Sequence, residues 1–313
     1  TGNKTIVRLQ VFSGKEITYQ SWNGVPESRL NNDYQGMLDY IGRNFTTEEE
    51  ANNLLNSGRN YNYYTYKNQV DDYQQDHYQL HLSHALNENL SCNLSLHYTY
   101  GNGFYEEYKN NESLSSYGLS DVIVVNDTIT QTDLIRRKWL KNDFYGFTFS
   151  INYTPAPAHE FILGGAANQY DGKHFHELIW MEYAQNNLPG TRYYEDDAIK
   201  TDQNIFLKYN WKINTMFSFF TDHQIRKIVY KFNGVVDINS DLIKQNASLT
   251  FYNPKAGINM RLSNKLNSFI YIGIANKEPN RSDYTESSLK SRPSSEKLID
   301  YEAGTIYKTN VFS

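Results

Sequence analysis

The stretch DHYQLHLSHALNENLSCNLSLHYTY, residues 76–100, alternates apolar and polar side chains on both sides of a short polar break. The alternating apolar positions are Tyr78, Leu80, Leu82, Leu90, Cys92, Leu94, Leu96 and Tyr98. A period of two is the period of a β-strand, whose successive side chains point to opposite faces. The break at Asn87–Asn89 is typical of a tight turn. The stretch therefore predicts a β-hairpin with one apolar face and one polar face.

The same alternation recurs along the chain and predicts about eleven antiparallel strands. Their expected ranges are 5–12, 16–22, 73–86, 90–106, 134–153, 160–180, 203–213, 217–232, 247–262, 268–277 and 298–307. One segment, Thr46–Leu55, has the pattern of a helix, because a capping Thr is followed by acidic residues in the first turn. The fold class expected is all-β.

The connections between these strands alternate between short and long. The short ones are Ser13–Lys15, Asn87–Asn89, Pro155–His159, Asn214–Met216 and Ser263–Asn267. The long ones are 23–72, 107–133, 181–202, 233–246 and 278–297. Compact domains rarely contain structureless connections of this length. Transmembrane β-barrels have short turns at one end and long extracellular loops at the other.

Strand length and face chemistry also favour a membrane barrel. The ranges 134–153 and 160–180 each hold about twenty residues, whereas a strand in a globular protein has about five or six. The apolar face would then contact lipid and the polar face would line a lumen, with Tyr98, Tyr153 and Trp180 near the interfaces. The alternative is a soluble antiparallel β-protein whose apolar face turns toward a core, and alternation alone does not separate the two.

Composition narrows the function classes. The mean hydropathy is -0.69 and no run of eighteen apolar residues occurs, which excludes helical membrane spans. The net charge of -5 gives no indication of a nucleic-acid partner. Cys92 is the single cysteine, which excludes internal disulfides and cysteine-based zinc sites. No catalytic motif is present, so we expect no enzyme activity, no catalytic residue, no metal site and no cofactor.

Several motifs resemble the barrel of TonB-dependent outer-membrane receptors, particularly the Bacteroidetes type. They include SGKEITYQSWNGVP (13–26), NQVDDYQQDHYQLHLSH (68–84), NPKAG (253–257), EPNRSDY (278–284) and EKLIDYE (296–302). The resemblance implies an antiparallel transmembrane β-barrel of about 22 strands with an N-terminal plug domain in its lumen. Because about eleven strands and no plug are recognised here, we expect residues 1–313 to form part of the barrel domain of a larger receptor.

The function implied by this resemblance is active uptake across the cell outer membrane. The substrate would be a scarce nutrient such as a ferric siderophore, haem, cobalamin or a glycan, and TonB would supply energy through the plug. The expected partners are outer-membrane lipid, TonB and a small-molecule or oligosaccharide ligand, and a surface lipoprotein is a further candidate. No nucleic acid is expected. The alternatives are a soluble β-rich ligand-binding or surface protein and a passive porin.

Four tyrosines, Tyr61, Tyr63, Tyr64 and Tyr66, lie in the longest expected outer loop. Tyrosine offers a broad stacking surface with a hydrogen-bonding tip, which suits both sugars and siderophores. These residues are the candidate ligand contacts. The alternative is that the rings pack the loop onto the rim of the barrel.

The polar strand face supplies the residues expected to line the lumen: His77, His81, His97, Asp222, Gln224 and Arg226. His77 and His81 are four residues apart, about 13 Å along a strand, which is too far for one shared metal. His174 and His176 are closer and could share a ligand with help from Glu177 or a loop. Lining the wall is the favoured role for all of these histidines, and haem or metal capture is the alternative.

Overall fold

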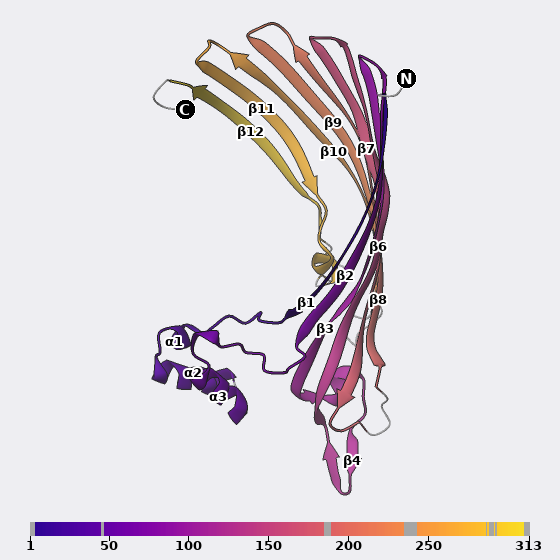
Figure 1. Ribbon diagram of the computed structural model, residues 1–313. Coiled ribbons are helices and arrows are strands. Elements are labelled where there is room, and N and C mark those ends of the chain that lie inside the picture. Colours follow the sequence, from indigo (N-terminus) through magenta and orange to yellow (C-terminus); the bar gives the residue numbers. More distant parts are fainter. Residues whose placement is uncertain are drawn as a thin grey trace.

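The computed structural model describes residues 4–44, 47–184, 189–234, 243–285, 287, 291 and 293–309. Ten antiparallel strands form one sheet, in the order β1-β2-β3-β6-β7-β8-β9-β10-β11-β12. The strands are β1 Thr5–Tyr19, β2 Val70–Asn87, β3 Leu90–Ser113, β6 Gln131–Ala156, β7 His159–Met181, β8 Thr191–Lys212, β9 Phe217–Gly234, β10 Ile243–Arg261, β11 Leu266–Lys277 and β12 Glu296–Tyr307. The sheet is strongly curved and is not closed (Figure 1).

The predicted hairpin at residues 76–100 is present as β2 and β3. Leu80 pairs with Leu96 and His81 pairs with Ser95, so like faces coincide across the two strands. The turn is stabilised by the side-chain oxygen of Asn87, which accepts a hydrogen bond from the Asn89 amide at 2.9 Å. This local bond explains why a polar break of three residues reverses the chain.

One predicted turn is absent. Ser13–Lys15 was expected to separate two strands, but β1 continues through it and pairs with β2 without interruption from Thr5 to Tyr19. The Ser13 hydroxyl donates a hydrogen bond to Asp76 at 2.5 Å. Gly14 lacks the positive φ that a tight turn would use. The expected strands 5–12 and 16–22 are therefore one strand, and the main sheet has ten strands where the sequence predicted about eleven.

Two of the expected long connections are shorter than predicted, because the strands extend into them. The β7–β8 connection spans only 182–190, and the connection from β3 to β6 spans 114–130. The latter holds a short 3₁₀ helix η2 (Leu114–Tyr117) and a small hairpin of β4 (Val122–Val124) and β5 (Asp127–Ile129). The expected connection 233–246 falls partly outside the described residues.

The excursion from β1 to β2 folds as a helical unit. It contains α1 (Glu27–Leu30), α2 (Tyr34–Asn44), α3 (Glu48–Asn56) and the 3₁₀ helix η1 (Gly58–Asn60). The sequence predicted only α3, which begins with a capping box between Thr47 and Glu50. A further short helix, α4 (Arg281–Thr285), lies in the β11–β12 connection. No helix in the described ranges is long and apolar enough to span a membrane.

The two faces of the sheet differ in chemistry along whole cross-strand rows. One row consists of Leu82, Leu94, Phe149, Gly165, Ile205 and Ile225. The adjacent row consists of His81, Ser95, Thr148, Ala166, Asn204 and Arg226. Directly paired residues point to the same face, so each row stays on one side of the sheet.

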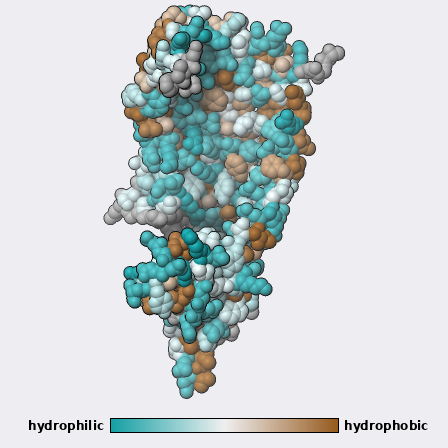
Figure 2. Space-filling model, turned by 60° about the vertical axis from the view of Figure 1, so that its left-hand side comes forward, coloured by the Kyte–Doolittle hydropathy of each residue, from teal (hydrophilic) through white to brown (hydrophobic). Residues whose placement is uncertain are grey.

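The polar row lies on the concave side. Arg226 bonds to Glu278 in the connection that leads into α4, and α4 lies inside the curve of the sheet (Figure 1). Figure 2 shows this hollowed face largely covered by hydrophilic residues, with hydrophobic residues along its margin. The apolar row is convex and stays exposed, at 36% for Leu94 and 53% for Ile225.

Candidate functional site

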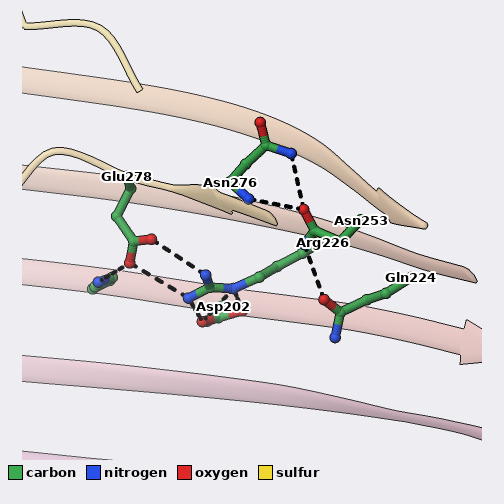
Figure 3. A network of polar contacts seen from close by, with 7 residues as sticks. Asp202, Gln224, Arg226, Asn253, Asn276 and Glu278 are labelled. Atoms are coloured by element: carbon green, nitrogen blue, oxygen red, sulfur yellow. Dashed lines mark hydrogen bonds and ion pairs between the residues drawn. The ribbon is translucent and has the colours of Figure 1, made fainter. Parts of the chain in front are cut away.

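The concave wall carries a charged cluster where the β11–β12 connection folds back onto β8 and β9. We call residues 278–284 the inner segment. The guanidinium of Arg226 lies between two carboxylates, with its Nη2 2.6 Å from Asp202 Oδ2 and its Nη1 3.2 Å from Glu278 Oε2 (Figure 3). Lys200 Nζ adds a third contact, 2.7 Å from Glu278 Oε1. Two cations and two anions thus balance where the inner segment meets the wall.

A chain of amides continues the cluster across three strands. Asn253 donates to the Gln224 side-chain oxygen at 3.0 Å, and Asn276 donates to the Asn253 side-chain oxygen at 2.9 Å (Figure 3). Asn253 is only 7% exposed. Because buried amides need partners, this chain fixes the relative positions of β9, β10 and β11 at this level.

A second anchor holds the far end of the inner segment. Arg281 forms an ion pair with Asp196, and it also contacts the Tyr194 oxygen and His174 Nδ1, each at 3.2 Å. Tyr284 packs against Ala198 and Phe232 in a small apolar cluster. A cavity of about 250 Å³ remains between the inner segment and the wall. The arrangement is suited to holding a segment and binding a solute.

The predicted lumen residues share the concave face, on β2, β3 and β9. His77 contacts Thr99 at 3.0 Å, His81 contacts Ser95 at 2.9 Å and His97 contacts Asn168 at 2.9 Å. Asp222 and Gln224 follow the parity of Arg226 on β9. Each of these imidazoles is bonded to the wall itself. Their contact with a lumen solute stays a prediction.

The structure separates Glu177 from the two nearby histidines. His174 and His176 lie on the concave side, whereas Glu177 follows an irregularity in the β7–β8 pairing and accepts a hydrogen bond from Trp139 at 2.7 Å on the convex side. Glu177 therefore does not assist these histidines in the alternative in which they share a ligand. Among the described residues, no group of three His, Cys, Asp or Glu side chains could hold a metal ion.

The four candidate tyrosines have different environments. Tyr61 is 6% exposed and packs with Met37 and Leu54 in the core of the helical unit. The Tyr66 hydroxyl donates to Glu106 at 2.7 Å, which attaches the excursion to β3. Tyr63 and Tyr64 line an open cavity of about 390 Å³. Their role as ligand contacts stays a prediction.

The pKa shifts of these tyrosines follow from burial. Burial raises the pKa of Tyr61 well above its ordinary value. Burial, together with the hydrogen bond to Glu106, raises the pKa of Tyr66 to about 12. Both phenols therefore remain protonated near neutral pH, so that the Tyr66 hydroxyl keeps its proton for the bond to Glu106.

Sequence reasoning missed most of the anchoring charges. Asp196, Lys200 and Asp202 lie on β8 but were expected in the connection 181–202, and Glu278 and Arg281 were also expected in a loop. The available signal was charge complementarity between EPNRSDY and alternate positions of residues 196–202. That complementarity identifies a contact only when the loop is known to fold inward.

No family model and no curated protein matches the sequence. Solved structures do match. The closed form of the ferric-catecholate import receptor Fiu from K12 E. coli is 11% identical, with a TM-score of 0.63 over 99% of this chain and 47% of that chain. The copper transporter OprC is 9% identical, with a TM-score of 0.57 over 76% of this chain and 38% of that chain.

The siderophore receptor PiuA from Acinetobacter baumannii is 10% identical, with a TM-score of 0.53 over 75% of this chain and 38% of that chain. The neighbours include TonB-dependent outer-membrane receptors. At this identity the likeness establishes the fold, so the expected class of antiparallel outer-membrane β-barrel is confirmed. The chain spans less than half the length of these matched structures.

The inner segment should depend on the charge of Glu278. Glu278→Gln removes the ion pairs to Lys200 and Arg226, and charged hydrogen bonds of this kind contribute about 1.5–3 kcal/mol. We expect faster hydrogen exchange of the 278–284 amides. Glu296→Gln is the matched control, because that carboxylate forms an exposed pair with Lys277 at 3.5 Å. Equal exchange in both variants would contradict the anchoring role.

The same anchor should weaken in acid. Burial alone would raise the pKa of Glu278. Hydrogen bonds from Lys200 and from the backbone, together with the charges of Lys200 and Arg226, outweigh burial and hold this pKa below its ordinary value of 4.5. A lowered pKa means that the anchor contributes fully above pH 4.5 and is lost as pH falls through the folded-state pKa. Protection of the 278–284 amides, corrected for intrinsic exchange rates, should therefore be constant from pH 7 to 6 and decline below 4.5. Protection that is unchanged in acid would exclude this anchor.

Proposed function

We propose that this chain forms part of the wall of an outer-membrane receptor barrel that imports a scarce nutrient. The observation that carries the proposal is the division of one curved sheet into an exposed apolar convex face and a polar concave face. In lipid the convex side chains contact acyl chains, and the concave side chains contact water inside the barrel. The similarity to import receptors supports this assignment.

The free edges of β1 and β12 are part of the proposal. Neither edge has a strand partner on its outer side among the described residues. Unpaired backbone groups in hydrocarbon cost several kcal/mol each, so a sheet that spans lipid must close. We propose that further strands of the complete protein pair with both edges and enclose the lumen.

The finer parts of the proposal follow from the sequence resemblance. The substrate would be a ferric siderophore, haem, cobalamin or a glycan, and TonB would supply the energy through a plug domain. A Bacteroidetes-type receptor working with a surface lipoprotein is the most specific form. The similar proteins are named for ferric catecholates, siderophores and copper. These names favour a metal-containing nutrient over a glycan.

The two alternatives, a soluble β-protein and a passive porin, predict different structures. A soluble β-protein needs a core to cover the apolar face, yet many large apolar side chains on the convex face are exposed in the described structure. A passive porin needs an open lumen, whereas two ion pairs hold the inner segment against β8 and β9 inside the curve of the sheet. Both observations favour the receptor.

Membrane insertion should distinguish the two faces of β3. Leu94→Arg places a charge on the convex face, where Arg near the bilayer midplane costs about 2–4 kcal/mol, whereas Ser95→Arg adds the same charge to the concave face. We expect Leu94→Arg to reduce the amount of detergent-extractable protein in outer-membrane fractions much more than Ser95→Arg. Equal loss, or recovery of the parent protein without detergent, would contradict the receptor assignment.

The long excursions should lie outside the cell. Protease added to intact cells should cleave within 20–69 and 114–130 and spare the turns at 87–90 and 213–216, because those turns lie at the opposite end of the sheet (Figure 1). Cleavage at the turns alone would mean that the topology is inverted.

The two half-buried tyrosines that line the open cavity should then serve ligand capture. Replacing Tyr63 and Tyr64 with Ala removes two rings from the open cavity without touching the strand ladder. We expect weaker ligand uptake with normal barrel assembly. Tyr61→Ala should loosen the helical unit more, because the Tyr61 ring is buried in its core whereas Tyr63 only packs against that core. Uptake that is unchanged in the double variant would assign these rings to loop packing.

A further inference from the structure

A second cavity opens on the concave wall, away from the Arg226 cluster. Its volume is about 390 Å³, within the range of small-molecule sites. Two adjacent cross-strand rows form its floor. The first consists of Asp71, Tyr105, Lys138, His176 and Tyr194, and the second consists of Glu16, Tyr73, Gly103, Leu140, His174 and Asp196. We call this cavity the wall pocket. Its lining includes the residues of both rows except Tyr194 and Asp196.

The wall pocket lies on the lumen side of the sheet. His174 and Asp196 belong to its second row and both contact Arg281 of the inner segment, which lies inside the curve. Gly103 deepens the floor because it has no side chain. A Cβ there would lie 2.3 Å from the Asp72 carbonyl oxygen, which is too close. The pocket is therefore a depression in the wall that only glycine permits at this position.

Two charged groups of the wall pocket lack an oppositely charged partner among the described residues, whereas three arginines elsewhere on the wall each have a carboxylate. Arg136 has Glu107, Arg226 has Asp202 and Arg281 has Asp196. In the described part of the chain, by contrast, Lys138 has no carboxylate partner, and its Nζ lies 5.2 Å from the centre of the Tyr105 ring. Asp71 likewise has neither a hydrogen-bond nor an ion-pair partner there.

The two unpaired charges have opposite sign and a fixed separation. Asp71 on β2 and Lys138 on β6 share one row, with Tyr105 on β3 between them. Neighbouring strands are about 4.8 Å apart, so the backbones of Asp71 and Lys138, which are two strands apart, are separated by about 10 Å. Glu16 strengthens the negative end, and the His176 ring stacks on Tyr194 at 4.3 Å beside Lys138. Asp71, Tyr105, Lys138 and His176 are all partly exposed and accessible to a solute.

We propose that the wall pocket binds a small dipolar solute with a flat body, a cationic group at one end and an anionic group at the other. The cation contacts Asp71 and Glu16, the anion contacts Lys138 and His176, and the body lies between these two ends, beside the Tyr105 side chain. Such a ligand replaces two separate hydration shells with complementary charges, which a singly charged solute cannot do. The inference rests on the proposed function in one respect, namely that this face meets water inside a barrel.

The test uses calorimetric titration of the complete protein in detergent with 4-(aminomethyl)benzoate, which has a ring between an ammonium and a carboxylate. Benzoate and benzylamine, its two halves, are the matched ligand controls. We expect saturable binding of the dipolar probe and at least about tenfold weaker binding of each half, because one charged contact is lost in each case.

Variants locate the binding to the pocket. Lys138→Met and Asp71→Asn should each weaken binding of the dipolar probe by about tenfold or more. Lys141→Met and Asp72→Asn are matched controls, because Lys141 and Asp72 lie on the same two strands but on the convex face. Unchanged circular dichroism in all four variants establishes that folding is intact.

Three outcomes would overturn the proposal: no saturable binding, equal affinity for the dipolar probe and its halves, or equal effects of Lys138→Met and Lys141→Met. Outer-membrane extraction of the same preparations keeps this test separate from the proposed function. A protein that is extracted from the outer membrane but does not bind the probe would exclude the wall pocket and leave the receptor assignment intact.

Discussion

The structure depends on one constraint, which is that the strand backbones satisfy their hydrogen bonds by pairing with neighbouring strands. The registers run unbroken through most of the sheet, for example from Thr5 to Tyr19 in β1 and from Ile243 to Met260 in β10. This ladder leaves each strand with two faces and fixes which side chains share a face. In hydrocarbon no water replaces a missing bond, so such a ladder, once closed into a barrel, is one of only two backbone arrangements that span a bilayer.

The ladder also explains how much of the fold the sequence could predict. Alternation located β2, β6, β7 and β9 to within a few residues, because a strand with one apolar and one polar face shows a period of two in its sequence. It failed at Ser13–Lys15, where a Ser-Gly pair typical of a turn lies within a paired strand. It also ended β3 early and began β8 late, because residues 107–113 and 191–202 carry charges on both faces and have no apolar stripe.

The site was less predictable than the fold for a physical reason. Arg226 was identified as a wall residue from strand parity alone, but its partners Asp202 and Glu278 come from a neighbouring strand and a distant connection. Whether a connection points outward or folds inward depends on contacts that have no sequence period. Likewise, Tyr61 and Tyr64 are close neighbours in sequence, yet the Tyr61 ring is buried in the helical unit and Tyr64 lines a cavity. Local composition could not separate them.

The central claim is that the convex face meets lipid and the concave face meets water. Spin labels placed one at a time at positions 93–98 of β3, in a Cys92→Ser background reconstituted in bilayers, measure this directly through their collision rates with oxygen and with a water-soluble nickel complex. The account predicts high oxygen accessibility at Leu94, Leu96 and Tyr98 and high nickel accessibility at Asn93, Ser95 and His97. Accessibility without a period of two, or with the two faces exchanged, would contradict it.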